Sequence, residues 1–450
     1  MREVVIITYS MIPHAVAWGG CQRMYYLADT LLNWGYEVTV FSVANKVEQT
    51  FGNSIRFNAK ALPIKNKFYK AFVDSKMQQK NKRTTIREKE SIVGKTRAII
   101  KKNKIVFNML DSIDKFLFNE PSFLMGPITR NWCKTYVEDI NQFISKREAE
   151  AVIISGPPFG MFSIAKGIKK KNKAIPIILD YRDPWNLWHK KSYYALNLEK
   201  RNFQYIDRVV FTNENLEKDM CKRFPILFGK TNIVMNGYSN EAWNKIKDKP
   251  MIRHDQLVIT YTGSCDIVET SQYSFRDVTV LFEALDKAIK AGCKIKLIFV
   301  GAANPNTSYA EKQKKRFGEH LQIIGMVNNK EAIQWMLESD ALLILHTTTD
   351  NSSKYLIGGK LYDYIRSRKY ILSIGDLEGL NSKIVKKEGI GLCSENSIEG
   401  IYQALTEMYE KWKSGGLNVR NINVEKYSRE YQNKHYVKII ENCKTQACKK

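Results

Sequence analysis

The sequence is poor in the patterns that mark disulfide-bonded, metal-binding and membrane-spanning proteins. Its eight cysteines are scattered and form no C-x-x-C pair, so we expect reduced thiols and a cytoplasmic protein. Its six histidines form no group with acids at metal-ligand spacing, so we expect no metal site. No apolar run reaches the roughly 18 residues that a membrane-spanning helix needs. The start of the chain, MREVVIITYS, is too short an apolar run for a signal peptide and predicts a first strand.

The dinucleotide fingerprint G-x-G-x-x-G is also missing, which argues against a standard nicotinamide site. The first strand-to-helix turn instead carries Gly19 and Gly20, between strands predicted at Val4–Thr8 and Val38–Val43. Apolar residues at helical spacing and a closing Gly35 predict the helix between those strands. Such turns bind ligands in α/β sheets, so we expect Gly19 and Gly20 to approach one.

Acidic residues are too few to balance the basic ones, and the formal net charge is +25. Nucleic acid, anionic lipid and a phosphorylated substrate are the partner classes that such a charge favours. About half of the excess lies in Lys60–Lys104, within the basic and aromatic stretch Phe57–Gln142. That stretch fits amphipathic helices on an anionic membrane surface, or equally a helical insertion with solvated lysines. It shows no nucleic-acid-binding module, so we expect no nucleic-acid partner.

A chain of 450 residues is too long for one core, and its pattern predicts two α/β domains. We expect an N-terminal domain at 1–245 with a basic helical insertion at 55–140, and a C-terminal domain at 255–420. The charged stretch between them, with Pro250, reads as a linker. A helix at 421–445 is expected to pack back on the first domain. Both domains alternate strands with helices, so we predict two Rossmann-like, doubly wound sheets facing a cleft.

The stretch Asp340–Ile374 carries the clearest ligand signal of the second domain. A buried strand at Ala341–Leu345 is followed by Gly358-Gly359-Lys360 and a helix. Free N–H groups and the dipole of a helix start favour an anion, and glycines allow close approach. Asp363 follows Lys360 by three positions on the same helix face, where it could accept hydrogen bonds from ribose. An ordinary helix start with an exposed lysine and aspartate would give the same pattern.

The first domain carries charged residues after a predicted strand at Ile175–Leu179. Arg182 and Asp183 lie at the carboxyl end of that strand, where parallel sheets bind substrates, and Pro184 defines the turn. We expect these two residues to position a substrate. A structural Arg–Asp pair in a loop is the alternative.

Several runs resemble glycosyltransferase family 4 (the GT-B architecture), in a bacterial subgroup that builds surface polysaccharides. They are WGGCQRMYYLADTLLNWGYEVTVFS, ISGPPF with ILDYRDPW, NIVMNGY, ITYTGS, LIFVGA, IIGMVNNKEAIQWMLESDALLIL and GGKLYDYIRSRKYIL. They occur in the family's order and leave only about 55–140 uncovered.

The resemblance implies site residues. Gly19 and Gly20 would approach the donor diphosphate or sugar, and Met326 and Val327 would lie near the base. Asp363 stands where the family has a carboxylate for the ribose. Lys360 and the amides near it would face the phosphates. The remaining expected contacts come from Gly263, Ser264, Gly358 and Gly359.

Three positions depart from the family pattern. Only Arg276 remains of the Arg and Lys that usually follow the "YTG" strand. Tyr355 replaces the first acid of the Glu-x7-Glu pair, with Asp350 nearby, and Phe159-Gly160 replaces a histidine that often follows the "PP" loop.

The expected activity is transfer of a sugar from a nucleoside diphosphate sugar to an acceptor hydroxyl, with retention, no cofactor and no metal. Arg276 and Lys360 would stabilise the departing diphosphate, and Asp183 would position the acceptor. A lipid-linked or growing surface glycan is the expected acceptor, at the inner face of the cell membrane. Two other readings remain: a nucleotide-sugar epimerase, and a catalytically degenerate protein that acts as a partner or scaffold.

Overall fold

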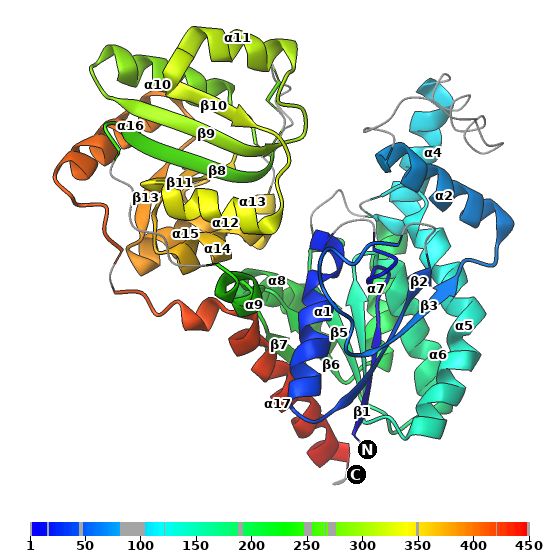
Figure 1. Cartoon of the computed structure of the whole chain (residues 1–450). Helices are drawn as coiled ribbons and strands as arrows, with labels where there is room; N and C mark the ends of the chain where they lie inside the picture. Colours follow the sequence, from blue (N-terminus) through cyan, green and yellow to red (C-terminus); the bar gives the residue numbers. More distant parts are fainter. Residues whose placement is uncertain are drawn as a thin grey trace. The chain divides into compact units, whose positions relative to one another are not determined.

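The computed structural model describes residues 2–15, 18–44, 48–81, 104–120, 122–187, 192–246, 254–265, 267–268, 276–347, 351–419 and 421–447. The chain forms two compact units, each with one sheet flanked by helices (Figure 1). Unit 1 comprises Met1–Met235 and Asn433–Lys450, and unit 2 comprises Asn236–Gln432. None of the helices in the described ranges is long and apolar enough to cross a membrane.

The sheet of unit 1 has seven strands in the order β3-β2-β1-β4-β5-β6-β7, and all its pairs are parallel. Its strands are β1 Glu3–Ile7, β2 Glu37–Ala44, β3 Asn58–Pro63, β4 Ala151–Gly156, β5 Ile177–Tyr181, β6 Arg208–Phe211 and β7 Thr231–Ile233. The β-branched run of β1 is buried throughout, as expected for a strand with helices on both faces. The strand order reverses between β1 and β4, so the loops after these strands open a crevice at the carboxyl edge.

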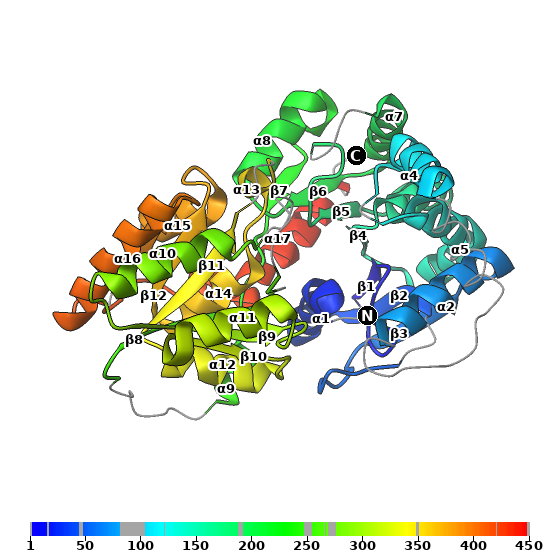
Figure 2. The ribbon, with the colours of Figure 1, turned by 90° about the horizontal axis from the view of Figure 1, so that it is seen from above.

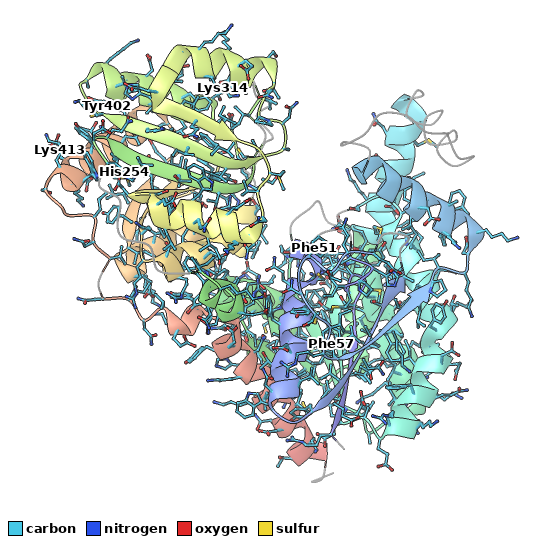
Figure 3. All side chains as sticks on the ribbon, viewed as in Figure 1. Phe51, Phe57, His254, Lys314, Tyr402 and Lys413 are labelled. Atoms are coloured by element: carbon cyan, nitrogen blue, oxygen red, sulfur yellow. The ribbon has the colours of Figure 1, made fainter. Side chains whose placement is uncertain are left out.

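Helices cover both faces of this sheet. They are α1 Trp18–Asn33, α2 Lys67–Asn81, α4 Lys104–Phe118, α5 Met125–Arg147, α6 Ile164–Lys171, α7 Tyr193–Asn202, α8 Glu214–Arg223 and most of α17 Arg429–Ala447, with short turns η1 Phe159–Ser163, η2 Phe203–Tyr205 and η3 Pro225–Leu227. Residues of α1 and α17 share one core with β1, β2 and β4. Phe57, labelled in Figure 3, lies in this core with its ring centroid 5.9 Å from that of Tyr25.

The predicted helical insertion at 55–140 begins as a strand, which corrects that prediction. β3 pairs with β2 in parallel as the edge strand of the sheet. Its sequence, NAKALP, has no fully buried residue, so it lacks the apolar pattern by which a strand is recognised. The rest of the stretch is helical where it is described, and α4 packs against α5 and α7 (Figure 2). Residues 82–103, with many of the basic side chains, lie outside the described residues.

The sheet of unit 2 has six strands in the order β10-β9-β8-β11-β12-β13, again all parallel. They are β8 Leu257–Cys265, β9 Ile295–Ala302, β10 Leu321–Ile324, β11 Ala341–His346, β12 Tyr370–Gly375 and β13 Gly391–Ser394. This is the doubly wound order with its reversal between β8 and β11. The Gly-Gly-Lys segment follows β11 and therefore lies at the edge where such sheets bind ligands.

Helices also cover both faces of the second sheet. They are α9 Asn240–Asn244, α10 Thr279–Lys290, α11 Ser308–Phe317, α12 Asn329–Glu338, α13 Ser352–Tyr355, α14 Gly359–Ser367, α15 Leu380–Glu388 and α16 Ile398–Lys413, with turns η4 Gly318–His320 and η5 Glu425–Tyr427. The main core joins α10, α11 and α16 to the strands, while Trp335 of α12 packs on a smaller cluster. The helix α9, expected in the first domain, belongs to unit 2. The last helix begins at Arg429, because Glu425–Tyr427 forms a separate short turn.

Candidate functional site

Glycines allow the carboxyl ends of β8 and β9 to pack closely against each other. Gly263 has φ +106° and Gly301 has φ +99°, conformations that favour glycine. A Cβ on Gly301 would lie 3.0 Å from the carbonyl carbon and oxygen of Gly263. The Gly301 amide in turn donates to the Gly325 carbonyl at the end of β10 (3.1 Å). The strand ends are therefore packed closely at the edge where a ligand would bind, and Gly263 and Ser264 themselves are exposed.

Lys360 extends its side chain to this edge from the first turn of α14. Its Nζ lies 3.4 Å from the ring centroid of Tyr261 and would lie 3.3 Å from a Cβ on Gly263. The Nζ atom is buried, and no residue in the described part of the chain accepts a hydrogen bond from it. Burial lowers the pKa of Lys360 well below its usual value, and the nearby charge of Arg276 lowers it further. The site thus holds an amine whose charged form lacks a counter-ion.

The start of α14 is held in place from two sides. The Tyr364 hydroxyl accepts hydrogen bonds from the Thr262 amide (2.9 Å) and the Thr262 hydroxyl (3.2 Å). The Gly358 amide donates to Asn381 Oδ1 (2.9 Å). Gly359 is exposed, and a Cβ there would meet nothing within 4 Å. The helix N-terminus and Lys360 therefore present positive charge from a rigid support.

Arg276 lies at the same edge. Its Nη1 donates to the Ser264 carbonyl at the end of β8 (2.7 Å). The neighbouring Asp277 amide donates to Thr347 Oγ1 (3.0 Å), which joins the start of α10 to the loop after β11. The structure therefore brings Arg276, Ser264 and Lys360 to one edge of the sheet, and their role at a ligand stays a prediction. Most of the loop before Arg276, and Asp350 after β11, lie outside the described residues.

The carboxylate of Asp363 accepts a hydrogen bond from another residue of unit 2. Its Oδ1 accepts a hydrogen bond from Trp243 Nε1 of α9 (2.9 Å). Burial raises the pKa of Asp363, and the Trp243 hydrogen bond and Arg429 oppose that shift. Lys360 and Asp363 therefore have different neighbours although they start from one turn of helix. A role for Asp363 at the ribose stays a prediction.

The predicted base-contact residues differ in exposure. Met326, just after β10, is 72% exposed, whereas Val327 packs against Val258, Ile298 and Val300. Met326 is thus available to contact a ligand, while Val327 supports the sheet. Tyr355, in the position of a family acid, is buried in α13.

The sequence analysis missed a polar group at the ends of β11 and β12. His346 Nε2 lies 2.9 Å from Ser352 Oγ, and Ser353 Oγ donates to Asp376 Oδ2 (2.6 Å). The Ser353 hydrogen bond lowers the pKa of Asp376. Asp376 directly follows a buried strand, which was the available signal.

In unit 1, Arg182 binds the backbone rather than presenting its charge. Its guanidinium donates to the carbonyls of Gly20 (2.8 Å), Gly156 (3.2 Å) and Pro157. It therefore connects the turns that follow β1, β4 and β5. Gly19 is exposed and a Cβ there would meet nothing within 4 Å. Gly19 and Gly20 themselves lie in the first turn of helix α1, which corrects the prediction that they form the loop before it. Arg182 therefore supports the start of α1, a role that was not predicted from the sequence.

Asp183, the neighbour of Arg182, keeps its carboxylate available. It has no hydrogen-bond partner among the described residues. Burial raises its pKa, and the charge of Arg182 opposes that rise. An unpaired carboxylate at a carboxyl edge is suited to accept a hydrogen bond from a substrate hydroxyl.

Unit 1 also contains two buried acids, Asp180 and Glu120, of which only Glu120 was not indicated by the sequence. Asp180 pairs with Arg23 (2.9 Å) and accepts hydrogen bonds from Ser155 (2.9 Å) and Tyr436 of α17. Glu120 accepts hydrogen bonds from the amides of Phe159 (2.9 Å) and Gly160 (2.6 Å). The loop that lacks the family's histidine is thus capped by an acid of the insertion.

No group of three or more histidine, cysteine, aspartate or glutamate side chains that could hold a metal ion occurs among the residues that the structure describes.

Comparison with known proteins identifies the fold and no family. No family model matches the chain. A stretch of 109 residues is 31% identical to the envelope protein OPG108 of Monkeypox virus, which is 24% of this chain and 32% of that protein. The chain thus spans about a third of the length of this curated relative.

Solved structures match the chain over nearly its full length. A glycosyltransferase from Rickettsia africae ESF-5 aligns with 98% of both chains at 13% identity and a TM-score of 0.58. The UDP-forming α,α-trehalose-phosphate synthase of Burkholderia xenovorans, solved with glucose-6-phosphate, covers 98% of this chain and 100% of its own at 9% identity, with a TM-score of 0.55. A UDP-N-acetylglucosamine 2-epimerase from Listeria monocytogenes, titled putative, covers 99% and 98% at 11% identity, with a TM-score of 0.54. The expected α/β fold with two Rossmann-like domains, that of GT-B proteins, is confirmed.

Proposed function

We propose that the protein is a glycosyltransferase that moves a sugar from a nucleoside diphosphate sugar to an acceptor hydroxyl. The observation that carries the proposal is the buried, unpaired Nζ of Lys360 at the glycine-lined end of β8. A diphosphate at this edge would supply the counter-ion that the amine lacks. The fold shared with two proteins titled as a glycosyltransferase and a UDP-forming synthase supports the same reading.

The chemistry needs negative charge to be stabilised on the departing diphosphate. Lys360, Arg276 and the N-terminus of α14 would supply positive charge from fixed positions, which is where such stabilisation is most effective. Gly263, Ser264, Gly358 and Gly359 would let the backbone approach the phosphates. The donor's base would contact Met326, and Asp363 would accept from ribose. We propose no protein nucleophile, and a reaction with retention that needs no metal.

In unit 1, Asp183 would accept a hydrogen bond from the acceptor hydroxyl, and Arg182 would hold Gly19 and Gly20 in place at the carboxyl edge. The role of Asp183 is inferred from its place at that edge and its free carboxylate, and the role of Arg182 from its hydrogen bonds to backbone carbonyls. That Gly19 and Gly20 approach a substrate is inferred from the family resemblance.

The acceptor we propose is a lipid-linked or growing surface glycan, with the protein at an anionic membrane surface of the cytoplasm. The net charge of +25 supports this. So does α4, where Met109, Ile113 and Phe116 are 56%, 46% and 58% exposed and recur at helical spacing.

An epimerase is the second candidate, because one structural neighbour is titled as a putative UDP-N-acetylglucosamine 2-epimerase. The two candidates give different products. A transferase releases the nucleoside diphosphate only when an acceptor, or water, takes the sugar, whereas an epimerase returns a nucleotide sugar with inverted configuration at one carbon. A degenerate scaffold would form neither product.

The first experiment is a thermal-shift screen against UDP, GDP, CDP and dTDP. A ligand at 100 times its dissociation constant should stabilise the fold by roughly 2.7 kcal/mol. We expect a shift with one of them that Lys360→Gln greatly reduces and Lys312→Gln, on the exposed side of α11, leaves intact. Asp363→Asn keeps a hydrogen-bond acceptor for Trp243, whereas Asp363→Ala also removes that contact. A reduced shift in Asp363→Asn is therefore better evidence for a lost ribose contact than a reduced shift in Asp363→Ala. No shift with any of the four would contradict the proposal and favour the scaffold.

Metal removal tests the proposed charge stabilisation separately. Turnover of the nucleotide sugar found in the screen should persist in excess EDTA, because protein cations take the role of a divalent ion. Loss of turnover that added Mg²⁺ or Mn²⁺ restores would contradict the metal-independent mechanism.

A further inference from the structure

Unit 1 contains a polar pocket of about 410 Å³, and none of Gly19, Gly20, Arg182 and Asp183 lines it. It is lined by α5, the end of η1, the start of α6, the end of α7 and η2 (α5, α6 and α7 are labelled in Figure 1). Its lining residues are Arg130, Ser163, Lys166, Leu198, Arg201, Asn202, Gln204 and Tyr205. The volume lies in the range of small-ligand sites, which is about 300–1,000 Å³.

The lining contains three cations and no acid. Arg130, Lys166 and Arg201 form no ion pair within the described ranges. Lys166 and Arg201 are exposed at the rim, and Lys166 Nζ lies 5.8 Å from the ring centroid of Tyr205. The pocket lining is therefore a local concentration of positive charge, which the carboxyl group of Glu120 near Arg130 offsets only in part.

Two buried N–H groups of the pocket residues lack acceptors. Arg130 Nε and Asn202 Nδ2 have no hydrogen-bond partner in the part of the chain that the structure describes. Asn202 is only 8% exposed. Buried donors are normally paired, so two unpaired ones in one small pocket point to a ligand with several acceptor oxygens.

The neighbouring acids accept hydrogen bonds from other groups and not from these two unpaired donors. Glu199, next to Leu198, accepts from the Tyr181 hydroxyl (3.0 Å) and Asn186 Nδ2 (2.8 Å). Both oxygens of Glu120 accept from backbone amides of η1. Neither acid forms an ion pair with Arg130, so its guanidinium remains able to bind an external anion.

We propose that this pocket binds a phosphate group, carried by a soluble phosphate ester or by an anionic lipid headgroup. A phosphate presents several acceptor oxygens and a charge of the right sign to the unpaired donors and the rim cations. The pocket lies in unit 1, whereas Lys360 lies in unit 2, so the proposal does not depend on the proposed glycosyltransferase activity.

The test is calorimetric titration of the full chain with inorganic phosphate. The pocket variant is Lys166→Gln with Arg201→Gln, both at exposed positions. The matched control is Lys171→Gln with Lys173→Gln, which removes two exposed charges from the same helix and its following turn. We expect phosphate affinity to fall about tenfold or more in the pocket variant and to stay unchanged in the control.

Lys360→Gln separates this site from the proposed donor site. Phosphate binding that survives Lys360→Gln and is lost in the pocket variant supports the pocket. Binding that only Lys360→Gln removes, or no binding in the wild type, overturns the proposal and leaves the pocket to solvent.

Vesicles then distinguish the two sources of the phosphate. The same variants are sedimented with vesicles of phosphatidylglycerol and phosphatidylcholine in equal parts, and with phosphatidylcholine alone. A several-fold loss of sedimentation with the anionic vesicles, seen in the pocket variant and not in its control, identifies a lipid headgroup. Equal sedimentation of both variants, together with lost phosphate binding in the pocket variant, identifies a soluble ester.

Discussion

Lys360 differs from Arg23, another buried cation among the described residues, because its Nζ has no hydrogen-bond partner there. Arg23 is 5% exposed and meets Asp180, two backbone carbonyls and Tyr436. Lys360 Nζ is buried against an aromatic ring with no acceptor in the described residues. A buried charge is costly unless it is paired, so the first arrangement supports the fold and the second is suited to bind an anion.

Binding of a nucleoside diphosphate should therefore take up a proton at Lys360. In the free protein burial lowers the pKa of Lys360, and a bound anion would raise it towards the usual value. Only the cation binds well, so affinity should fall as pH rises between the free and bound pKa, by up to about tenfold per pH unit. Calorimetry in buffers of different ionisation heat measures the uptake directly. Lys360→Gln should abolish it, and uptake that persists in this variant would assign it to another group.

The raised pKa of Glu120 predicts that the stability of the folded state changes with pH in one direction. Burial raises its pKa from 4.5 to about 7, although two amide hydrogen bonds and Arg130 oppose the shift. The folded state then holds a proton that the unfolded state has lost, so stability should decrease as pH rises from about 4.5 to about 7 and level off above. The size of the effect is up to about 3 kcal/mol.

Urea unfolding at several pH values checks this expectation. Glu120→Gln should flatten the profile in part, since Glu199 has a similarly raised pKa of about 7 and remains. Glu138→Gln, an exposed change in α5, should leave the profile as it is. A wild-type stability that rises over this range would show that the carboxylate form of Glu120 is the native one.

At the scale of elements, one buried network holds α1 and α17 to the end of β5. Asp180 is fully buried and joins Arg23 of α1, Tyr436 of α17 and Ser155 of β4. Arg23 also donates to the Val234 carbonyl (2.8 Å) and the Met235 carbonyl (3.1 Å). Asp180, which joins these contacts, directly precedes Tyr181-Arg182-Asp183 in the chain. The network therefore positions the turn that carries the candidate acceptor residues.

Asp180→Asn should destabilise unit 1 by about 3–5 kcal/mol, because it leaves the Arg23 charge buried without a counter-ion. Tyr436→Phe removes the hydroxyl that donates to Asp180 and accepts from Arg23, and should cost about 1–3 kcal/mol. Asp29→Asn, which breaks a partly exposed pair with Arg56, should change stability by less than about 1 kcal/mol. Denaturant unfolding measures all three. Equal small effects would contradict the role of Asp180 as the buried counter-ion of Arg23.

At the scale of the molecule, the core around β1 in unit 1 and the main core of unit 2 share none of the described residues. The core around β1 includes Tyr436, Val437, Ile439, Ile440 and Cys443, from near the end of the chain. The main core of unit 2 draws on residues from Leu257 to Met408. Each core is of the size that lets a domain unfold by itself, so we expect two separable unfolding transitions.

Ile440→Ala should lower only the unit 1 transition, by about 2–5 kcal/mol, because it opens a cavity in a fully buried position. Leu405→Ala is the matched change in unit 2 and should lower only the other transition. The nucleoside diphosphate found in the screen should raise the transition that Leu405→Ala lowers. Calorimetric scanning resolves these effects, and a single transition that shifts with both substitutions would contradict two independent cores.

Prediction from the sequence succeeded where one local pattern was sufficient. The apolar runs of β1, β8 and β11 are strands, and Gly358-Gly359-Lys360 begins a helix at the carboxyl edge. It failed where the local pattern was weak. The edge strands β3 and β13 are short and only partly buried, so they carry little apolar signal. Arg182 was correctly placed at an edge, but its backbone partners lie 25 to 162 residues away in sequence.

By itself the sequence determined the two doubly wound halves and the position of the Gly-Gly-Lys turn, because hydrophobic period and glycine conformation act between near neighbours. Three features were decided only by the tertiary structure. Lys360 Nζ has no hydrogen-bond partner among the described residues, Arg182 donates its hydrogen bonds to backbone carbonyls, and Glu120 accepts from amides of the loop after β4. The tertiary structure also brought Arg130, Lys166 and Arg201 to one pocket. Charge pairing and burial depend on which distant segments meet, and this follows from packing rather than from any local pattern.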